Sequence, residues 1–330
     1  MIHPIPPGTR DVLPEEMGEL RRLQRALLDV FEERGYGEVA TPAIEYDEVL
    51  ARGDGRTAAG AYRFFDEGDL LALRSDMTVP IARLAASRMA GAGTPLRLCY
   101  MASAYRAVRP QRGQMREFIQ AGVELIGESA PQGTAEIIEV LEAALDAAGL
   151  DRAVIGLGDA DLYRQLLTEY GVEGEARDSI IGRLATHDLV GLEAELSAVA
   201  GISDEQCATC VALSQLRGGS EVLAQARVLG GAAVERATAR LQETFEELER
   251  RGVADRVQID LGLLRDLGYY SGAILEVYDP ALGHVLGGGG RYDSLLKRFG
   301  ADLPAAGFAL YLERVHVAQM EESRRGREER

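Results

Sequence analysis

The residue types best suited to chemistry gather in residues 105–127, which read YRAVRPQRGQMREFIQAGVELIG. Four arginines come first, and a glutamine and a glutamate follow at a spacing of four: Arg106, Arg109, Arg112, Arg116, Gln120 and Glu124. Arginines clustered on one short hairpin usually meet an anion. Residues four apart on a strand point to the same face, so Gln120 and Glu124 would share one side. The stretch therefore predicts that cations and a polar pair converge on one place.

Two further motifs carry polar groups, and each alone has an ordinary structural explanation. In LRSDMT, Asp76 and Thr78 lie two apart, a same-face pair in an extended chain, although both residue types are also good helix caps. In LLRDLGYY, Arg265 precedes Tyr270 by five residues. Because adjacent residues on a strand point to opposite faces, at most one of Tyr269 and Tyr270 would line a given pocket.

Together these side chains suit a small zwitterion. Asp76 and Gln120 would hold an α-amino group, and Arg265 would hold an α-carboxylate. Glu124 and a tyrosine would meet a polar side chain. The set therefore predicts a site for a molecule with the charges of an amino acid.

A run of glycines occupies residues 287–290 in LGGGGRYDSL. Such a run can let backbone approach a phosphate. No Lys-Ser/Thr pair follows, so the motif is not a P-loop, and it does not open a βαβ unit as the dinucleotide fingerprint does. A bend in a sheet is the simpler interpretation, and a strand passing close beneath a small ligand is the alternative.

The three cysteines are too few for a disulfide framework. Cys207 and Cys210 form one C-x-x-C, whereas a zinc site needs about four ligands. The remaining candidates are Cys99 and four scattered histidines. We therefore expect no metal ion and no cofactor, and interpret the pair as two thiols on a short helix.

The charge balance bears on possible partners. The chain has 53 acidic and 36 basic residues, a formal net charge of −17, which argues against a protein that mainly grips nucleic acid. No stretch approaches the roughly 18 apolar residues of a membrane span. The N-terminus, MIHPIPPGTRDVLPEE, does not resemble a signal peptide. We expect a cytoplasmic protein.

The periodicity predicts an α+β fold. One stripe of apolar residues predicts a helix over residues 15–34: Leu20, Leu23, Leu27, Val30 and Phe31. Residues 96–108 and 116–127 are β-leaning and predict a hairpin with the basic loop at its tip. Residues 158–251 are mostly helical, and β-like sequences return after them. Strands at both ends and helices between them predict one antiparallel sheet interrupted by an insertion at about 170–250.

Seven motifs occur in one order: PPGTRDVLPEE, TPAIE, LRSDMT, the arginine stretch, LRDLGYYSGAILEVY, GGGGRYDSLLKRFG and AAGFALYLER. They resemble the catalytic core of histidyl-tRNA synthetase, a class II aminoacyl-tRNA synthetase, over most of residues 4–316. The resemblance implies a six-stranded antiparallel sheet flanked by helices, which dimerises through the TPAIE region. A single core domain would then span residues 1–320, followed by a charged, disordered tail at 321–330.

The resemblance also implies a histidine pocket. Its members would be Asp76, Thr78 and Gln120 at the amino end, Arg265 at the carboxylate, Glu124 and Tyr270 at the imidazole, Tyr269 and Tyr292 nearby, and Arg106. In synthetases the motif-two arginine, matched here by Arg106, contacts the phosphate of ATP and the adenylate. Arg314 matches the motif-three arginine.

Several departures distinguish this sequence from a synthetase. Val108 stands where a glutamate hydrogen-bonds the adenine amino group, a loss of about 1–3 kcal/mol. Tyr311 stands where a glycine is usual, and its phenol would take space that a nucleotide uses. LRSDMT replaces LRPEGT, and RDLGYY replaces RGLDYY. The chain ends 16 residues past Arg314, which leaves no room for an anticodon-binding domain of about 100 residues.

This pattern resembles the family of ATP phosphoribosyltransferase regulatory subunits, which are synthetase paralogues of histidine biosynthesis. The resemblance implies a non-catalytic subunit that assembles with a short-form catalytic subunit as a hetero-octamer. It also implies a requirement for full activity and feedback inhibition by L-histidine, with no tRNA bound.

Two alternatives remain open on the sequence. The first is a truncated enzyme that still adenylates histidine, which the retained Arg106, Arg265 and Arg314 would support. The second is a binding module for another amino acid or partner, because a single sequence does not exclude a different ligand. Pyrophosphate exchange would separate the adenylating enzyme from a regulatory subunit.

Overall fold

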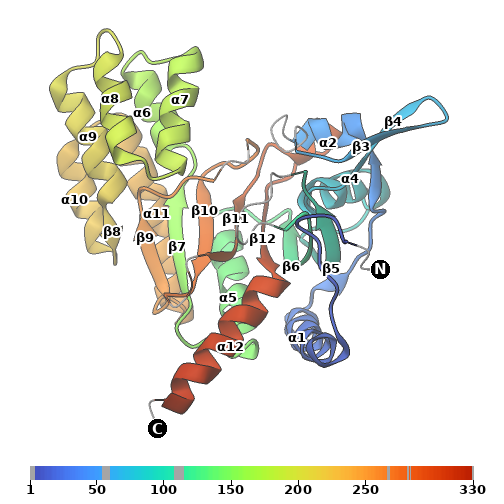
Figure 1. The fold of residues 1–330 in the computed structure, drawn as a ribbon. Coiled ribbons are helices and arrows are strands. Elements are labelled where there is room, and N and C mark those ends of the chain that lie inside the picture. Colours follow the sequence, from blue (N-terminus) through green and yellow to red (C-terminus); the bar gives the residue numbers. More distant parts are fainter. Residues whose placement is uncertain are drawn as a thin grey trace.

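The computed structural model describes residues 4–53, 60–107, 115–265, 268–280, 282 and 284–328, and the side chains as far as residue 325. A central sheet carries helices α1, α5 and α12 on one side, and helices α6–α11 lie at one end of it (Figure 1). A small second sheet with α2 and α4 lies toward the other end. Val108 and the predicted basic tip, Arg109 to Gln114, lie outside the described residues.

Within the described residues the main sheet has nine strands in the order β1-β5-β6-β12-β11-β10-β7-β9-β8. In that order their bounds are Gly37–Glu38, Leu96–Tyr105, Glu117–Ile126, Ala305–Tyr311, Val285–Arg291, Ala273–Tyr278, Val154–Asp159, Val257–Asp260 and Arg217–Gly218. Every neighbouring pair from β5 to β7 is antiparallel. Parallel pairs extend the sheet from β5 to β1 and from β7 to β9. The predicted six-stranded antiparallel sheet is thus confirmed as the centre of a larger mixed sheet.

Strand β7 was not predicted from the sequence. Its segment, VIGLGD, contains two glycines, which are rare in strands and lower the β signal. All six of its residues nevertheless pair with β10, and Ile155 and Leu157 are fully buried. Gly158 leaves no room for a larger side chain, because a Cβ there would lie 2.9 Å from the carbonyl oxygen of Asp260. Close packing therefore explains the glycine that obscured the strand.

Helix α1 (Pro14–Glu33) confirms the predicted amphipathic helix. Pro14 suits the first turn, where its missing N–H has no intrahelical partner, and acidic residues there complement the helix dipole. Leu23, Leu27 and Phe31 are buried at helical spacing against the sheet. The Phe31 ring meets Phe308 of β12 edge-on, with centroids 6.0 Å apart.

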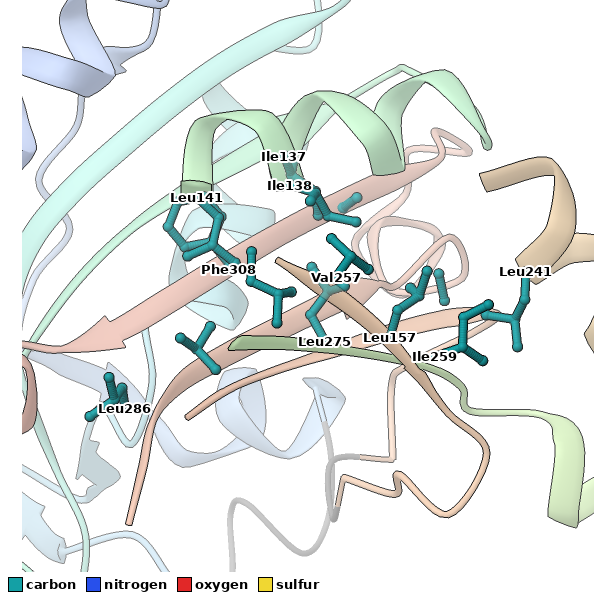
Figure 2. Packing of buried hydrophobic residues seen from close by; sticks show 14 of the residues in the cluster. Ile137, Ile138, Leu141, Leu157, Leu241, Val257, Ile259, Leu275, Leu286 and Phe308 are labelled. Carbon is teal, nitrogen blue, oxygen red and sulfur yellow. The ribbon is translucent and has the colours of Figure 1, made fainter. Parts of the chain in front are cut away.

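Helix α5 (Gln132–Ala147) covers the middle of the same sheet face. Figure 2 shows Ile137, Ile138 and Leu141 of α5 facing Phe308 of β12 and Leu275 of β10. Burying each such side chain contributes about 1.5–3 kcal/mol. This layer makes the sheet rigid enough to hold polar side chains on its opposite face.

The opposite face has its own buried cluster. Met77, Val79 and Ile81, at the start of helix α4 (Thr78–Arg88), pack with Tyr100 of β5 and Ile274 of β10. The 3-10 helix η1 (Leu296–Phe299) also joins this face. Beside it, helix α2 (Asp47–Gly53) adjoins a three-stranded sheet in the order β2-β4-β3, with bounds Ile44–Tyr46, Asp69–Leu73 and Arg63–Asp66.

Strand β6 alternates between the two faces. Ala121, Val123 and Leu125 belong to the core beneath α1 and α5. Gln120 and Glu124, which are buried as well, lie at the intervening positions and point toward the α4 face. The period of two in the sequence therefore determines which face carries the polar pair.

Six helices lie between β7 and β9: α6 (Leu162–Glu169), α7 (Gly174–Ala185), α8 (Leu189–Ala198), α9 (Asp204–Gln215), α10 (Glu221–Leu229) and α11 (Ala232–Arg251). Leu166, Ile180, Leu196 and Leu213 are buried among them and belong to the same core cluster as α5. The interpretation of this block as an insertion at about 170–250 in one domain of residues 1–320 stays a prediction.

Helix α12 (Leu312–Glu328) corrects the prediction of a disordered tail, which is wrong for residues 321–328. Its opposite charges lie three positions apart and pair along the helix, as Glu321 and Arg324 do at 2.8 Å. In the parts of the chain that the structure describes, we find no helix that is both long and apolar enough to cross a membrane.

Candidate functional site

One cavity on the α4 face brings the predicted site together. Eight of the nine predicted residues line it: Asp76, Thr78, Arg106, Gln120, Arg265, Tyr269, Tyr270 and Tyr292. The ninth, Glu124, accepts hydrogen bonds from two members of the lining. Gly288, Gly307 and Tyr311 complete the wall with their neighbours on β12. Segments far apart in the sequence therefore converge as the residue types predicted.

Glu124 is the most enclosed ionisable group of the site, with 1% of its surface exposed. Thr78 Oγ1 donates to its Oε1 at 2.8 Å, and the phenol of Tyr292 donates to its Oε2. Burial raises the pKa of Glu124 to about 8, although these two hydrogen bonds act to lower it, and the nearby Asp76 raises it further. Near neutral pH the carboxyl is therefore mostly protonated, and a ligand that donates a hydrogen bond would favour its ionised form.

A glycine opposite this carboxyl makes the arrangement possible. Gly307 of β12 pairs with Glu124 of β6, and a Cβ at position 307 would overlap Glu124 Oε2. The carboxyl thus occupies the space that a side chain on β12 would need. A glycine at this position is required by a close approach inside the sheet face.

Gln120 carries an unused acceptor. Its side chain is 3% exposed, and within the described part of the chain its Oε1 has no hydrogen-bond partner. Leaving a buried carbonyl oxygen unpaired costs about 1–3 kcal/mol. A ligand ammonium in the cavity would satisfy this oxygen.

Arg265 carries an unused donor. Its Nη1 donates to the carbonyl oxygens of Leu275 at 3.1 Å and Gly287 at 3.4 Å. Its Nε is buried and has no partner among the described residues. A ligand carboxylate would accept from this nitrogen, while the backbone holds the other end of the guanidinium in place.

The glycine run makes room for Arg265. A Cβ at Gly288 would overlap Arg265 Nη1, and Gly288 lies in the cavity wall. Residues 287–290 belong to strand β11, whose pairing with β10 shifts register between Val285 and Gly287, so the interpretation as a sheet bend stays a prediction. The alternative, a strand passing close beneath a small ligand, is compatible with the place of Gly288 in the cavity wall.

Asp76 and Thr78 of LRSDMT lie both at the start of a helix and in the cavity wall. Asp76 Oδ1 accepts from the backbone N–H of Val79 at 3.1 Å, so it does hold the start of α4. The same carboxylate is 5% exposed and lines the cavity together with Thr78. The helix start therefore fixes an acid at the cavity, where an ammonium would be favourable.

Tyr269 and Tyr270 correct one expectation. They precede strand β10, which begins at Ala273, so the opposite-face rule for strands does not apply. Both line the cavity, and their rings lie 4.9 Å apart. Tyr292 meets Tyr269 edge-on at 6.1 Å and completes an aromatic wall. Burial raises the pKa of all three phenols, so they act as neutral hydrogen-bonding groups.

Arg106 and Arg314 meet at Tyr311. Arg106 Nε donates to Ser75 O at 3.1 Å and its Nη1 donates to the phenol oxygen of Tyr311 at 3.4 Å. Arg314 Nη1 donates to Val285 O at 2.7 Å, and its guanidinium lies 4.7 Å from the Tyr311 ring centroid. The predicted set of site residues omitted Tyr311. The sequence did mark this residue as unusual, because it stands where the last of the seven motifs usually has a glycine.

The C-x-x-C pair lies away from this cavity. Cys207 and Cys210 are free, buried thiols on α9, and Cys207 Sγ donates to the carbonyl oxygen of Glu193 at 3.9 Å. Among the described residues no group of His, Cys, Asp and Glu could hold a metal ion. Both thiols belong to the core cluster that these helices bury.

The arrangement suits a zwitterion. An ammonium would meet Asp76 and Gln120 Oε1, a carboxylate would meet Arg265 Nε, and a polar side chain would meet Glu124. The volume of the cavity that is open to the centre of a water molecule is about 20 Å³. That volume suits about one water molecule, so an amino acid requires side chains of the wall to move.

Comparison with known proteins gives the family. The family model of histidyl-tRNA synthetase matches residues 8–315. A protein of Moorella thermoacetica named ATP phosphoribosyltransferase regulatory subunit is 41% identical, over 96% of this chain and 82% of its own length. The chain belongs to the family of ATP phosphoribosyltransferase regulatory subunits. Its relatives are named as regulatory subunits, which agrees with the prediction of a chain other than the catalytic one.

Solved structures confirm the class II synthetase fold of this regulatory-subunit family. An ATP phosphoribosyltransferase regulatory subunit/histidyl-tRNA synthetase from Bacillus halodurans is 33% identical, with a TM-score of 0.86 over 97% of this chain and 84% of its own. A histidine–tRNA ligase subunit from Alicyclobacillus acidocaldarius is 30% identical, with a TM-score of 0.84 over 98% and 99%. The similarity thus extends over nearly the whole chain.

Proposed function

We propose that this chain binds free L-histidine without reacting it and regulates a short-form catalytic subunit of ATP phosphoribosyltransferase, the first enzyme of histidine biosynthesis. The catalytic subunit would need this chain for full activity and would receive feedback inhibition through it. The chain would act in the cytoplasm, as part of a hetero-octamer and without binding tRNA. Membership of the regulatory-subunit family supports ATP phosphoribosyltransferase as the regulated enzyme. The residues of the cavity support histidine as the ligand.

The observation that carries the ligand is the pair of unused groups in one cavity. Gln120 Oε1 needs a donor and Arg265 Nε needs an acceptor. A free amino acid supplies both, as an ammonium and a carboxylate. Glu124 lies directly behind the lining residues Thr78 and Tyr292, which both donate to it, and its carboxyl would accept an imidazole N–H from a ligand that moves this wall. Histidine would serve all three groups, whereas an aliphatic amino acid would bring Glu124 no donor beyond Thr78 and Tyr292.

Binding can influence a partner through the movement that it requires. Because the cavity suits about one water, histidine must displace part of the wall, which includes loops before β10 and after β5. Couplings between allosteric sites are typically about 1–3 kcal/mol, or about 5-fold to 150-fold in affinity. Such a coupling is large enough for feedback inhibition.

Self-association through the TPAIE region is supported by exposed apolar side chains. Five of them lie on the small sheet: Ile44, Tyr46, Phe64, Phe65 and Leu70. Phe65 is 78% exposed. The strand register places Ile44, Tyr46 and Phe64 on one face of this sheet, and Phe65 and Leu70 on the other. Exposed apolar side chains that gather on one small element mark a candidate interface. We infer that a second copy of this chain covers the small sheet.

Calorimetric titration of the purified chain tests the ligand. We expect L-histidine to bind, ATP not to bind, and Glu124→Ala to weaken histidine binding at least tenfold. Glu243→Ala, at an exposed position of α11, is the matched control. An unchanged affinity in Glu124→Ala would contradict the proposed pocket.

The regulatory role needs a second assay. With a short-form catalytic subunit, activity should require this chain, and histidine should inhibit the wild-type complex but not the Glu124→Ala complex at the same concentration. If the catalytic subunit has the same activity with and without this chain, the proposed regulatory role is wrong.

One observation favours an alternative, a histidine-adenylating enzyme. Arg106, Arg265 and Arg314 are all present, and they converge on one side of the cavity. Histidine-dependent exchange of pyrophosphate into ATP would establish this alternative, and its absence beside clear histidine binding would favour the regulatory subunit.

A further inference from the structure

Three guanidinium groups converge on one phenol at the end of strand β12. Arg106 follows β5, Arg265 precedes β10 and Arg314 lies in the first turn of α12. Arg106 Nη1 reaches the Tyr311 oxygen at 3.4 Å, and the guanidinium of Arg314 lies 4.7 Å from the ring. Three elements from distant parts of the chain thus supply positive charge to one side chain.

Backbone carbonyls hold all three guanidiniums in position. Arg106 donates to Ser75 O, Arg265 to Leu275 O and Gly287 O, and Arg314 to Val285 O. A carbonyl orients a guanidinium but does not neutralise its charge. The backbone therefore orients three positive charges toward one place, an arrangement that suits an anion such as phosphate.

The Tyr311 ring is fixed where such an anion would lie. Phe118 packs against it edge-on, with centroids 5.4 Å apart, and Gln120 is its direct neighbour across β6 and β12. Tyr311 also lines the cavity that holds the unpaired oxygen of Gln120. Tyr311 therefore stands next to Gln120 on one side and to Arg106 and Arg314 on the other, whereas Arg265 serves both the zwitterion site and the cluster.

Electrostatics distinguish Tyr311 from the other phenols of the cavity. Burial acts to raise its pKa, but Arg106, Arg265 and Arg314 outweigh burial and lower it to about 8. The pKa of Tyr269, Tyr270 and Tyr292 is raised instead. The charged groups facing Tyr311 are these three arginines, and the carboxylate of Glu313 beside it is turned to the backbone N–H of Ile119. Tyr311 thus serves as an internal acid whose anion the cluster stabilises.

We propose that Tyr311 determines the ligand class of this cavity: its phenol fills the position where the three arginines would bind a phosphate group. The cavity then accepts a ligand with one carboxylate and rejects a phosphorylated one. The part concerning the accepted ligand rests on the proposed histidine site, whereas the exclusion of phosphate stands on the arginine cluster alone. Specificity of this kind comes from an element that opposes the wrong ligand.

Calorimetry with sodium pyrophosphate as the probe tests the exclusion on the full chain. Tyr311→Ala removes the ring and should bind pyrophosphate at least tenfold more tightly than the wild type. Tyr278→Phe, a phenol that bonds Gln258 away from the cavity, is the matched control and should behave as the wild type. Equal pyrophosphate affinity in the wild type and folded Tyr311→Ala would overturn the proposal.

A double variant tests whether the increase in pyrophosphate affinity arises at the arginine cluster. Adding Arg106→Gln to Tyr311→Ala should return pyrophosphate affinity toward the wild-type value, because one of the three guanidiniums is lost. An increase in pyrophosphate affinity that persists in the double variant would place the anion away from the arginine cluster and would overturn the assignment. L-histidine titrated into the wild type is a separate arm, so a failure of the histidine site leaves the pyrophosphate result decisive.

A spectroscopic measurement covers the case in which Tyr311→Ala fails to fold. Ultraviolet absorbance of phenolate, titrated from about pH 7 to about pH 9 in the wild type, should show one tyrosine ionising near pH 8. Tyr311→Phe should lose that step and Tyr278→Phe should keep it. Coincident titration curves for the wild type and Tyr311→Phe would overturn the internal-anion role.

Discussion

Tyr292 donates a hydrogen bond to Glu124 across 168 positions of sequence, and Thr78 donates to the other carboxyl oxygen at 2.8 Å. Both donors hold an acid that is 1% exposed. Because burial dominates these bonds, the pKa of Glu124 rises to about 8. The cavity therefore keeps a carboxyl that is costly to ionise until a ligand supplies a further donor.

The first prediction concerns pH and the free energy of unfolding. The folded-state pKa of Glu124 is raised from 4.5 to about 8, so between these values the folded chain binds more protons than the unfolded chain. Stability from this group is present below the unfolded pKa and is lost as pH rises toward 8. In the wild type this loss of unfolding free energy should be on the order of a few kcal/mol between about pH 5 and about pH 8. Glu124→Gln should lack most of this loss when both proteins are unfolded with urea across that pH range.

A matched variant isolates the buried carboxyl. Glu243→Gln makes the same chemical change at an exposed position of α11 and should leave the wild-type pH dependence unchanged. If Glu124→Gln shows the same slope as the wild type, Glu124 ionises normally and its role as a protonated acid is wrong.

The second prediction concerns the carboxylate end of the ligand. Arg265→Gln should weaken L-histidine binding about tenfold to a hundredfold, equivalent to about 1.4–3 kcal/mol, because a charge-assisted hydrogen bond is lost. Histidinol, which lacks the carboxylate, should bind the wild type weakly and bind Arg265→Gln about as well as it binds the wild type. Calorimetric titration of both ligands measures the difference.

Arg88→Gln, at an exposed position in the last turn of α4, is the control for this pair. It should keep the wild-type preference for histidine over histidinol. Retention of the full preference in Arg265→Gln would assign the carboxylate to another residue.

The third prediction concerns the glycine that faces Glu124. Gly307→Ala forces a Cβ into the space of Glu124 Oε2 and also close to Val123 O, so the strand or the carboxyl must shift. We expect a loss of about 1–3 kcal/mol in unfolding free energy and a loss of histidine binding. Gly91→Ala, where no atom lies within 4 Å, should be nearly neutral by thermal and urea unfolding. A stable Gly307→Ala with normal histidine binding would show that the close approach is not needed.

Part of the site follows from local rules of sequence. Gln120 and Glu124 share a face because side chains on a strand alternate, and their strand was recognisable from its apolar run. Helix α1 was equally recognisable from its stripe. Such features depend on neighbours within a few residues, so one segment contains all the information they need.

The remaining features depend on contacts between distant segments. The turn before β10 brings Tyr269 and Tyr270 to the same cavity, whereas the strand rule separated them. The two glycines of β7 concealed a strand whose partner lies more than a hundred residues away. Tyr311 stood out as an unusual residue in its motif, but its three arginines come from separate elements. A pattern of residue types gives no geometry of this kind.

The fourth prediction concerns self-association through the small sheet. Phe65 is 78% exposed on strand β3, an edge of this three-stranded sheet, and its direct neighbour across the sheet is the exposed Leu70 of β4. Phe65→Glu places a charge in an apolar contact, where burying it without a partner is costly. We expect the mass measured by light scattering after size exclusion to fall from that of a dimer to that of one chain.

The control is the same kind of substitution outside the small sheet. Val190 on α8 is 82% exposed, so Val190→Glu changes net charge equally and should leave the dimer intact. If both variants remain dimeric, a different surface joins the two copies. If both become monomeric, the added charge acts through general repulsion between chains that already carry a net charge of −17, and raising the salt concentration should restore the dimer in both variants.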